Sequence, residues 1–170
     1  MNKILLVPHI LLRQKSKKLN KVCKEDINLS KKMIKIMKNV LGVGLAANQI
    51  GILKKIVTIC IQDQEKKIEK SYALFNPKIK SFSKETVVME EGCLSLPKQF
   101  ADIERPISIN LEYIDENNQI IEEEKYGYEA RVLQHEIDHL SGKLFVDYLS
   151  SLKRNMIIER VLKLQKKGEI

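Results

Sequence analysis

The residues with the clearest capacity for chemistry form the segment HEIDH at positions 135–139. His135 and His139 are four positions apart, so on a helix both imidazoles lie on one face and can reach a single metal ion. Glu136 lies about a third of a turn away, where its carboxylate can contact a metal-bound water without ligating the metal. Two surface histidines give the same spacing by chance, but two of the chain's three histidines form this pair. The segment therefore predicts a metal site.

A catalytic metal site usually has three protein ligands and one open position, so a third ligand must come from elsewhere in the chain. Cys93 in the segment EGCLS is the best candidate, because a thiolate binds zinc or ferrous iron strongly and Gly92 permits a tight backbone beside it. The competing candidates are Asp138, Glu136 and Cys60. Cys60 lies in the apolar run IVTICI, which favours a buried apolar role instead.

A third segment, GVGLAANQIG at positions 42–51, is rich in small residues that let a backbone approach a ligand closely. Its Gln49 amide can donate a hydrogen bond to a developing oxyanion. Taken alone, the segment is better explained as a glycine loop between a helix and a strand. It lacks the Gly-Lys-Ser/Thr sequence of a phosphate loop. Five of the seven glycines nevertheless lie in or beside these three segments, namely Gly42, Gly44, Gly51, Gly92 and Gly142.

The elements that must position these segments follow from hydrophobic spacing. Apolar residues three to four apart predict a helix over 26–41, and helices are also predicted over 129–140 and 151–167. Strands are predicted at 55–61, at 72–75 ending at Asn76 and Pro77, and at 107–113, where apolar and polar residues alternate. Pro97 is expected to end a strand soon after Cys93. A sheet with helices grouped around it indicates an α+β fold.

A chain of 170 residues with 44% hydrophobic residues is typical of one globular domain, which we expect to cover residues 1–170. No apolar run reaches the roughly 18 to 20 residues of a membrane span, and no small-residue cleavage site follows the apolar N-terminus, so we expect a soluble chain with a mature N-terminus. Cys23, Cys60 and Cys93 are widely spaced and odd in number, which fits the cytoplasm rather than a disulfide framework. The net charge of +8 indicates either an anionic partner or a lysine-rich surface that favours solubility.

The segments GVGLAANQ, EGCLS and HEIDHLSG, in this order, resemble the three defining motifs of the peptide deformylases. The similarity extends through QHEIDHLSGKLFVDYLS, LKRNM and ILLVPHILLR, so it covers nearly the whole chain. It implies one deformylase catalytic domain, in which mainly antiparallel sheets surround a central HExxH helix, with further helices toward the N- and C-terminal ends. It also implies a hydrolase that removes the formyl group from the N-terminal methionine of newly made polypeptides and releases formate.

The resemblance implies one divalent metal ion per chain, with water in the fourth position and three protein ligands, Cys93, His135 and His139. The family uses ferrous iron and accepts zinc, nickel or cobalt, so Fe²⁺ is the expected native ion. Such an ion lowers the pKa of its bound water. Glu136 is then expected to pass the proton of that water to the departing methionine nitrogen. The Gln49 amide and the Leu94 backbone N–H are expected to stabilise the oxyanion.

Recognition of methionine is predicted partly from helix spacing. Tyr128 and Val132 precede the first histidine of the pair by seven and three positions and share its helix face, so we expect them to line the methionine pocket together with Val43. Packing of these residues into the core is the alternative. Gly44 and Leu94 match motif positions whose backbones hold the substrate peptide by edge-strand pairing in the family.

Three residues depart from the family pattern. Phe100 stands where many relatives carry Arg, so the resemblance does not extend to an ionic contact with the tail of the substrate. Tyr128 and Glu129 replace an apolar pair that is common before the metal helix, so the resemblance does not fix the size of the pocket. The residues expected to carry out the reaction are all present.

Residues 149–170 hold six Lys or Arg and two Glu. Leu152, Met156, Val161 and Leu164 lie roughly on one side, which predicts a basic amphipathic helix able to dock on ribosomal RNA near formylmethionyl nascent chains. A solvated face on a packing helix is the alternative. DNA and membranes are not expected partners.

Two rival functions share some of these features. A metallopeptidase also uses HExxH, but its zinc ligands are more usually two His with Glu, or three His. A non-catalytic RNA-binding module with a structural metal is the second rival. Structural zinc sites are normally closed by four protein ligands, whereas this sequence offers three.

Overall fold

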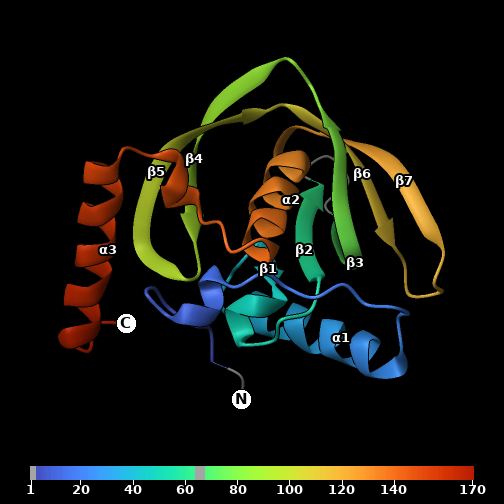
Figure 1. The fold of residues 1–170 in the computed structure, drawn as a ribbon, viewed down its shortest axis with the longest axis horizontal. Helices are drawn as coiled ribbons and strands as arrows, with labels where there is room; N and C mark the ends of the chain where they lie inside the picture. Colours follow the sequence, from blue (N-terminus) through green and yellow to red (C-terminus); the bar gives the residue numbers. More distant parts are fainter. Residues whose placement is uncertain (1–2, 64–67) are drawn as a thin grey trace.

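The computed structural model describes residues 3–63 and 68–170. Within these ranges the chain forms a five-stranded sheet, a two-stranded hairpin and helices packed around them (Figure 1). The α-helices are α1 (Lys24–Asn39), α2 (Gly127–Leu140) and α3 (Ser151–Lys166), and the short 3-10 helices are η1 (Ile10–Arg13), η2 (Ala47–Ile50) and η3 (Phe145–Tyr148). None of the helices in this part of the chain has both the length and the hydrophobicity needed to cross a membrane.

The five-stranded sheet is antiparallel throughout and has the strand order β1-β2-β3-β6-β7. Its strands are β1 (Gly44–Ala46), β2 (Ile56–Asp63), β3 (Ile68–Phe82), β6 (Ser108–Ile114) and β7 (Ile120–Tyr126). β1 lies at one edge of the sheet and pairs with β2 alone among the described strands. One side of β1 is therefore open to a further strand.

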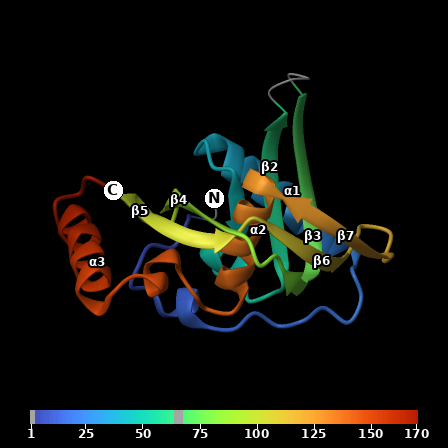
Figure 2. The same ribbon diagram turned by 90° about the horizontal axis from the view of Figure 1, so that it is seen from above.

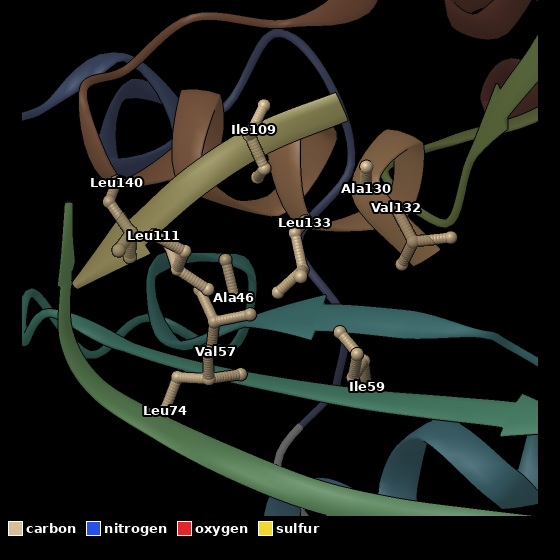
Figure 3. Close-up of a cluster of buried hydrophobic side chains, with 10 residues drawn as sticks. All are labelled: Ala46, Val57, Ile59, Leu74, Ile109, Leu111, Ala130, Val132, Leu133 and Leu140. Carbon is tan, nitrogen blue, oxygen red and sulfur yellow. The ribbon is translucent and has the colours of Figure 1, made fainter. Parts of the chain in front are cut away.

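Helices α1 and α2 cover opposite faces of this sheet. Alternate residues of β2 point to opposite faces because a strand has a side-chain period of two. Val57 and Ile59 belong to a buried cluster with Leu133 of α2 (Figure 3), whereas Ile56 belongs to another with Met33 of α1. β2 is apolar along its length because both of its faces are buried, and α2 is held against the centre of the molecule.

The second sheet is a hairpin of β4 (Thr86–Cys93) and β5 (Leu96–Pro106) joined by a tight turn. Helix α3 packs against this hairpin at one side of the molecule, away from the five-stranded sheet (Figures 1 and 2). Ile157 and Val161 of α3 share a buried cluster with Leu96 and Ile103 of β5. The hairpin therefore has a core of its own, which holds its turn in a fixed position.

The α+β fold expected from the sequence is confirmed, with antiparallel sheets around α2 and with α1 and α3 toward the two ends of the chain. The three predicted helices are α1, α2 and α3, and their ends differ from the predicted ends by at most two residues. The predicted strands 55–61 and 107–113 are β2 and β6. Acidic and amide residues at 115–118 form the turn that joins β6 to β7.

Two predicted strand ends were wrong. Asn76 and Pro77 do not end a strand, because β3 continues past them with a shift of register between Phe75 and Lys78. Proline is tolerated at such an irregularity because no ladder hydrogen bond is required of it there. Asn76 adopts a left-handed backbone with φ of 52°, which asparagine accepts more readily than most residues. Pro97 is the second residue of β5, so it begins a strand instead of ending one.

Candidate metal centre and active site

The turn of the β4–β5 hairpin and helix α2 bring together three side chains that can ligate a metal. Cys93, His135 and His139 each offer a ligand atom, and these atoms lie within 4.8 Å of one another. The Cys93 Sγ and the His139 Nε2 are 3.3 Å apart. Both histidines are buried. One soft sulfur and two imidazole nitrogens suit zinc or ferrous iron, so the donor set fits the ion expected from the sequence.

The direction of the His135 ring is fixed by a buried carboxylate. Glu91 lies two residues before Cys93 on β4, and its Oε2 is 2.9 Å from His135 Nδ1. Because an ionised carboxylate can only accept, Nδ1 carries the proton and Nε2 is left to ligate a metal. Burial opposes protonation of the ring, but the hydrogen bonds with Cys93 and Glu91 hold the pKa of His135 well above its ordinary value, so a metal ion would displace the proton of Nε2 on binding.

Two arginines hold Glu91 in turn. Arg105 donates from Nε to Oε1 at 2.6 Å and from Nη2 to Oε2 at 3.1 Å, and Arg131 donates from Nη1 to Oε1 at 2.7 Å. Burial raises the pKa of Glu91, but the hydrogen bonds from His135 and Arg105 outweigh this effect and lower the pKa to about 2. Arg105 also donates to Asp138 of α2 at 2.9 Å. Glu91 is therefore ionised at neutral pH and connects the hairpin to α2.

Glu136 is buried beside the three candidate ligands, and its Oε2 has no hydrogen-bond partner among the described residues. Burial raises the pKa of this carboxyl to about 7, against the lowering effect of the His135 imidazole. Glu136 Oε1 lies against Gly44 of β1, where an added Cβ would be 2.4 Å from that oxygen. Gly44 therefore leaves the space that Glu136 occupies. A carboxyl group in this position can accept and release a proton near neutral pH.

The glycine-rich segment forms β1 and η2 rather than a plain loop, and it orients the amide of Gln49. The backbone N–H of Ala46 donates to Gln49 Oε1 at 2.8 Å, which identifies the other end of the amide as the donor end. Gln49 Nε2 donates to Ser95 Oγ at 3.2 Å and lies 3.6 Å from Cys93 Sγ. The donor end of the amide therefore faces the candidate metal centre.

A cavity of about 900 Å³ opens onto this centre, a size typical of a site for a small ligand. Its walls include the candidate catalytic residues Gln49, Cys93, His135 and Glu136 and four of the residues expected to bind substrate, Val43, Gly44, Leu94 and Tyr128. The mouth carries exposed apolar side chains, among them Leu41 and Phe100. The cavity thus combines an apolar mouth with a polar base.

Val132 has a different position from the one expected. It is 5% exposed and belongs to the buried cluster that joins α2 to the sheet (Figure 3), and it is absent from the described walls of the cavity. Val132 and Leu133 belong to the same cluster, so this part of α2 packs against the strands of the sheet. Core packing, the alternative considered for this residue, describes its surroundings in this structure.

The residues that depart from the family pattern have individual explanations. Phe100 packs over Gly92, where an added Cβ would be 2.6 Å from the ring. Glu129 accepts hydrogen bonds from the Tyr72 hydroxyl and from Lys125 Nζ, so its charge is paired between α2 and the sheet. Of Tyr128 and Glu129, only Tyr128 lines the cavity.

Sequence reasoning missed four polar residues that surround the ligands, namely Glu91, Ser95, Arg105 and Arg131. A signal for Glu91 was present, because residues two apart on a strand share a face and Glu91 is two positions before Cys93. No local pattern marked the two arginines. They reach Glu91 only because the fold places β5 and α2 on either side of it.

Comparison with known sequences identifies the family. The chain matches the family described as Polypeptide deformylase over residues 1–155. A peptide deformylase of Pelagibacter ubique is 45% identical over 162 residues, which cover 95% of this chain and 94% of that protein. A peptide deformylase of Rickettsia canadensis is 42% identical over 166 residues, which cover 95% of each chain.

Comparison with solved structures agrees. The crystal structure of a peptide deformylase from Ehrlichia chaffeensis is similar with a TM-score of 0.91 at 38% identity, and the match covers 99% of this chain and 98% of that one. A peptide deformylase structure from Legionella pneumophila gives 0.89 at 35% identity, with the same coverage. These matches favour neither a metallopeptidase nor a non-catalytic RNA-binding module. The chain belongs to the polypeptide deformylase family, and its activity is that of a hydrolase that removes the N-formyl group from nascent polypeptides.

Proposed function

We propose that the chain removes the formyl group with the help of one divalent metal ion held by Cys93, His135 and His139. The observation that carries this proposal is the convergence of three ligand atoms within 4.8 Å, two of them on residues that line the cavity, Cys93 and His135. When bound, such an ion lowers the pKa of a water molecule and so supplies a nucleophile near neutral pH. We propose Fe²⁺ as the native ion and Zn²⁺, Ni²⁺ or Co²⁺ as substitutes, because a thiolate with two imidazoles accommodates each of them.

Glu136 acts in this proposal as general base and then as general acid. A carboxyl group with a pKa of about 7 can take a proton from water and return it to the methionine nitrogen with little loss of free energy in either step. Its Oε2, which has no partner in the described chain, is the atom available to hold that proton. The formyl C–N bond breaks as the nitrogen gains the proton, and formate and a free amino terminus leave.

Gln49 and Leu94 stabilise the negative charge that develops on the formyl oxygen. Gln49 Nε2 donates to Ser95 Oγ and lies 3.6 Å from the Cys93 sulfur, which supports a second N–H directed at the reacting centre. Leu94 follows Cys93 in the hairpin turn and lines the cavity, which supports the role proposed for its backbone N–H. Donors that are already oriented lose little free energy to reorganisation during the reaction.

The peptide that follows the formyl group is held through its backbone. Strand β1 has one side open, and Val43 and Gly44 line the cavity there, which supports pairing of an extended peptide with this edge. Leu94 supplies backbone groups from the opposite wall. The methionine side chain enters the apolar part of the cavity near Tyr128. Backbone recognition suits an enzyme that must accept many sequences after methionine.

Two further parts of the proposal concern where the chain acts. Helix α3 carries exposed Leu152 and Met156 among basic residues, which supports contact with ribosomal RNA near nascent formylmethionyl chains. Cys23, Cys60 and Cys93 are all free thiols, which supports a reducing compartment such as the cytoplasm.

Metal analysis of anaerobically purified protein, paired with a formate-release assay on formyl-Met-Ala-Ser, tests the reaction and the ligands together. We expect about one ferrous ion per chain, loss of formate release on chelation, and recovery with Fe²⁺, Ni²⁺ or Co²⁺. Replacing any of the three ligands with Ala should remove both metal and activity. Internal peptide bonds of an unformylated control peptide should remain intact.

The Glu136→Ala variant separates metal binding from catalysis. We expect it to keep its metal and to lose formate release by at least about a hundredfold, the usual range for loss of a general base. Activity close to that of the unmodified protein would rule out Glu136 as the base. A Cys93→Ala variant that still binds one ion with unchanged affinity would rule out the proposed ligand set.

A further inference from the structure

The positive charge of the chain is concentrated in its N-terminal third. Residues 1–55 contain 13 Lys or Arg and 2 Asp or Glu, whereas residues 56–170 contain 17 Lys or Arg and 20 Asp or Glu. The net charge of +8 therefore comes from the N-terminal third, which includes α1 and the segment that leads into it. The basic residues of the α3 region are outweighed by acidic residues elsewhere in 56–170.

Helix α1 presents much of this charge as a narrow line of side chains. Lys24, Lys31, Lys35 and Lys38, here called the lysine stripe, are all exposed. At 3.6 residues per turn they fall within an arc of about 60° and span about 21 Å of the helix axis. Met33 and Met37 are buried on the other side of α1. Figure 1 shows α1 along the lower edge of the molecule, with no helix or strand on its outer side.

The stripe is largely without acidic neighbours. Only Lys38 is in an ion pair, with Glu69, and in the described part of the chain Lys24, Lys31 and Lys35 make none. The two carboxylates of α1 lie in its first turn, and one of them, Asp26, is paired with Lys54 at 2.6 Å. Lysines four and three apart along the stripe repel one another. The sequence thus keeps a line of like charges whose mutual repulsion opposes the helix.

The surroundings of the stripe favour a nucleic acid over a protein as its partner. Protein interfaces have an apolar centre, but the exposed residues of α1 are Lys, Asn and Glu, with no exposed large apolar side chain among them. Binding to a phosphate backbone needs only properly spaced cations. The stripe has no aromatic residue on which an unpaired base could stack, which favours a duplex over a single strand.

We propose that the lysine stripe of α1 binds the phosphate backbone of double-helical RNA without reading its sequence. The choice of RNA over DNA rests on the proposed function, because nascent chains are made on an RNA-containing assembly. The stripe ends beside the cavity, because Asn39 of α1 and the following Val40 and Leu41 line its mouth. RNA bound along α1 therefore lies next to the entrance through which a formylated chain must pass.

Fluorescence anisotropy with a labelled 20-base-pair RNA hairpin, titrated at several KCl concentrations, tests this surface. The test variant is K24Q/K31Q/K35Q, and the matched control is K70Q/K78Q/K84Q, which removes the same charge from exposed positions on and beside β3. We expect the test variant to bind at least tenfold more weakly at low salt and the control to change less than twofold. The slope of log affinity against log salt should shrink by about 0.9 for each phosphate that is no longer neutralised, or about 2 to 3 in all.

Three results would overturn the proposal. The first is an equal loss in the test and control variants, which would show that only total charge matters. The second is an unchanged test variant together with complete loss in a K163Q/K166Q/K167Q variant of α3. The third is tighter binding of a labelled polyglutamate than of the RNA, abolished in the test variant, which would identify an acidic protein as the partner. Formate release from formyl-Met-Ala-Ser should stay unchanged in every variant, because none of these lysines lines the catalytic centre.

Discussion

At Gly44 the backbone of β1 touches the side chain of Glu136, and an added Cβ would be 2.4 Å from its Oε1 and 2.8 Å from its Cδ. Real Cβ atoms do not approach other atoms so closely, so any side chain at this position must displace the proposed base. We expect Gly44→Ala to lower kcat/KM for formyl-Met-Ala-Ser by about a hundredfold, since small displacements of catalytic groups have effects of that size. Metal content should remain that of the unmodified protein.

Gly168→Ala is the matched control, because nothing lies within 4 Å of a Cβ added there. Its activity should stay within about twofold, apart from a small loss of stability from its left-handed backbone. Full activity in the Gly44 variant would mean that Glu136 can move aside and still transfer protons.

The raised pKa of Glu136 also has a consequence for stability. The folded protein binds this proton more tightly than the unfolded chain, so ionisation of the carboxyl destabilises the fold as pH rises from about 4.5 to about 7. Glu136→Gln should therefore increase the free energy of unfolding at pH 8 by about 2 to 3 kcal/mol, and by little near pH 4. Urea unfolding of chelator-treated proteins at both pH values measures this. An equal or smaller stability at pH 8 would contradict the assignment.

At the scale of elements, the β4–β5 hairpin is joined to α2 through one ionised group. Glu91 is held by Arg105 of β5 and by Arg131 and His135 of α2, and its pKa falls to about 2. A carboxyl with a lowered folded pKa contributes stability that is present above the unfolded value of about 4.5 and disappears as pH falls toward 2. The contribution is about 3 kcal/mol from the size of the pKa shift.

Replacing Glu91 with Gln should therefore flatten the acid dependence of stability. We expect the free energy of unfolding of the variant to change by about 2 to 3 kcal/mol less between pH 5 and pH 2.5 than that of the unmodified protein. The variant should also bind metal about 10- to 100-fold more weakly, because the partner that orients His135 is weakened. Equal pH slopes in urea unfolding, with unchanged metal affinity in a chelator competition, would show that Glu91 has neither role.

Some helices and strands could be predicted from the sequence alone, and others could not. The three helices were predictable because their apolar residues recur every three to four positions, and β2 because it is an unbroken apolar run buried on both faces. β1, β5 and β7 were not predicted, and β4 was anticipated only as a strand that Pro97 would end. β4 and β7 are mostly exposed and β7 reads IIEEEKY, so their pairing with β5 and β6 determines them more than their own composition does.

The candidate site also has residues that a local pattern indicates and residues that only the fold brings together. Cys93, His135 and His139 lie in segments whose residue types indicate metal binding, whereas Arg105 and Arg131 belong to β5 and α2 and meet only in the folded chain. Val132 was expected in the pocket because it shares a helix face with His135. The structure packs it into the cluster under the sheet, and helical spacing alone cannot distinguish a cavity from a core on the same face.

At the scale of the whole molecule, the two basic helices lie far apart. Figures 1 and 2 both show α3 on the outer side of the hairpin and α1 at the five-stranded sheet. If α3 contacts ribosomes as proposed, K163Q/K166Q/K167Q should lower cosedimentation with ribosomes at low salt by about tenfold or more, since each lysine removed leaves a phosphate without its cation. These residues are exposed, so buried Val161 should still hold the helix in place. Unchanged cosedimentation would rule out this role of α3.

The hydrogen bonds around Glu91 have a consequence for when a metal ion can bind to the chain. The side chains that orient the His135 ring are bonded to one another and to the backbone of β4 and β5, so hydrogen bonds within the chain hold this ring in position. Loading and exchange can then take place on a folded chain. We therefore expect the ion that the chain holds, and with it the catalytic rate, to depend on which ions the surrounding medium supplies.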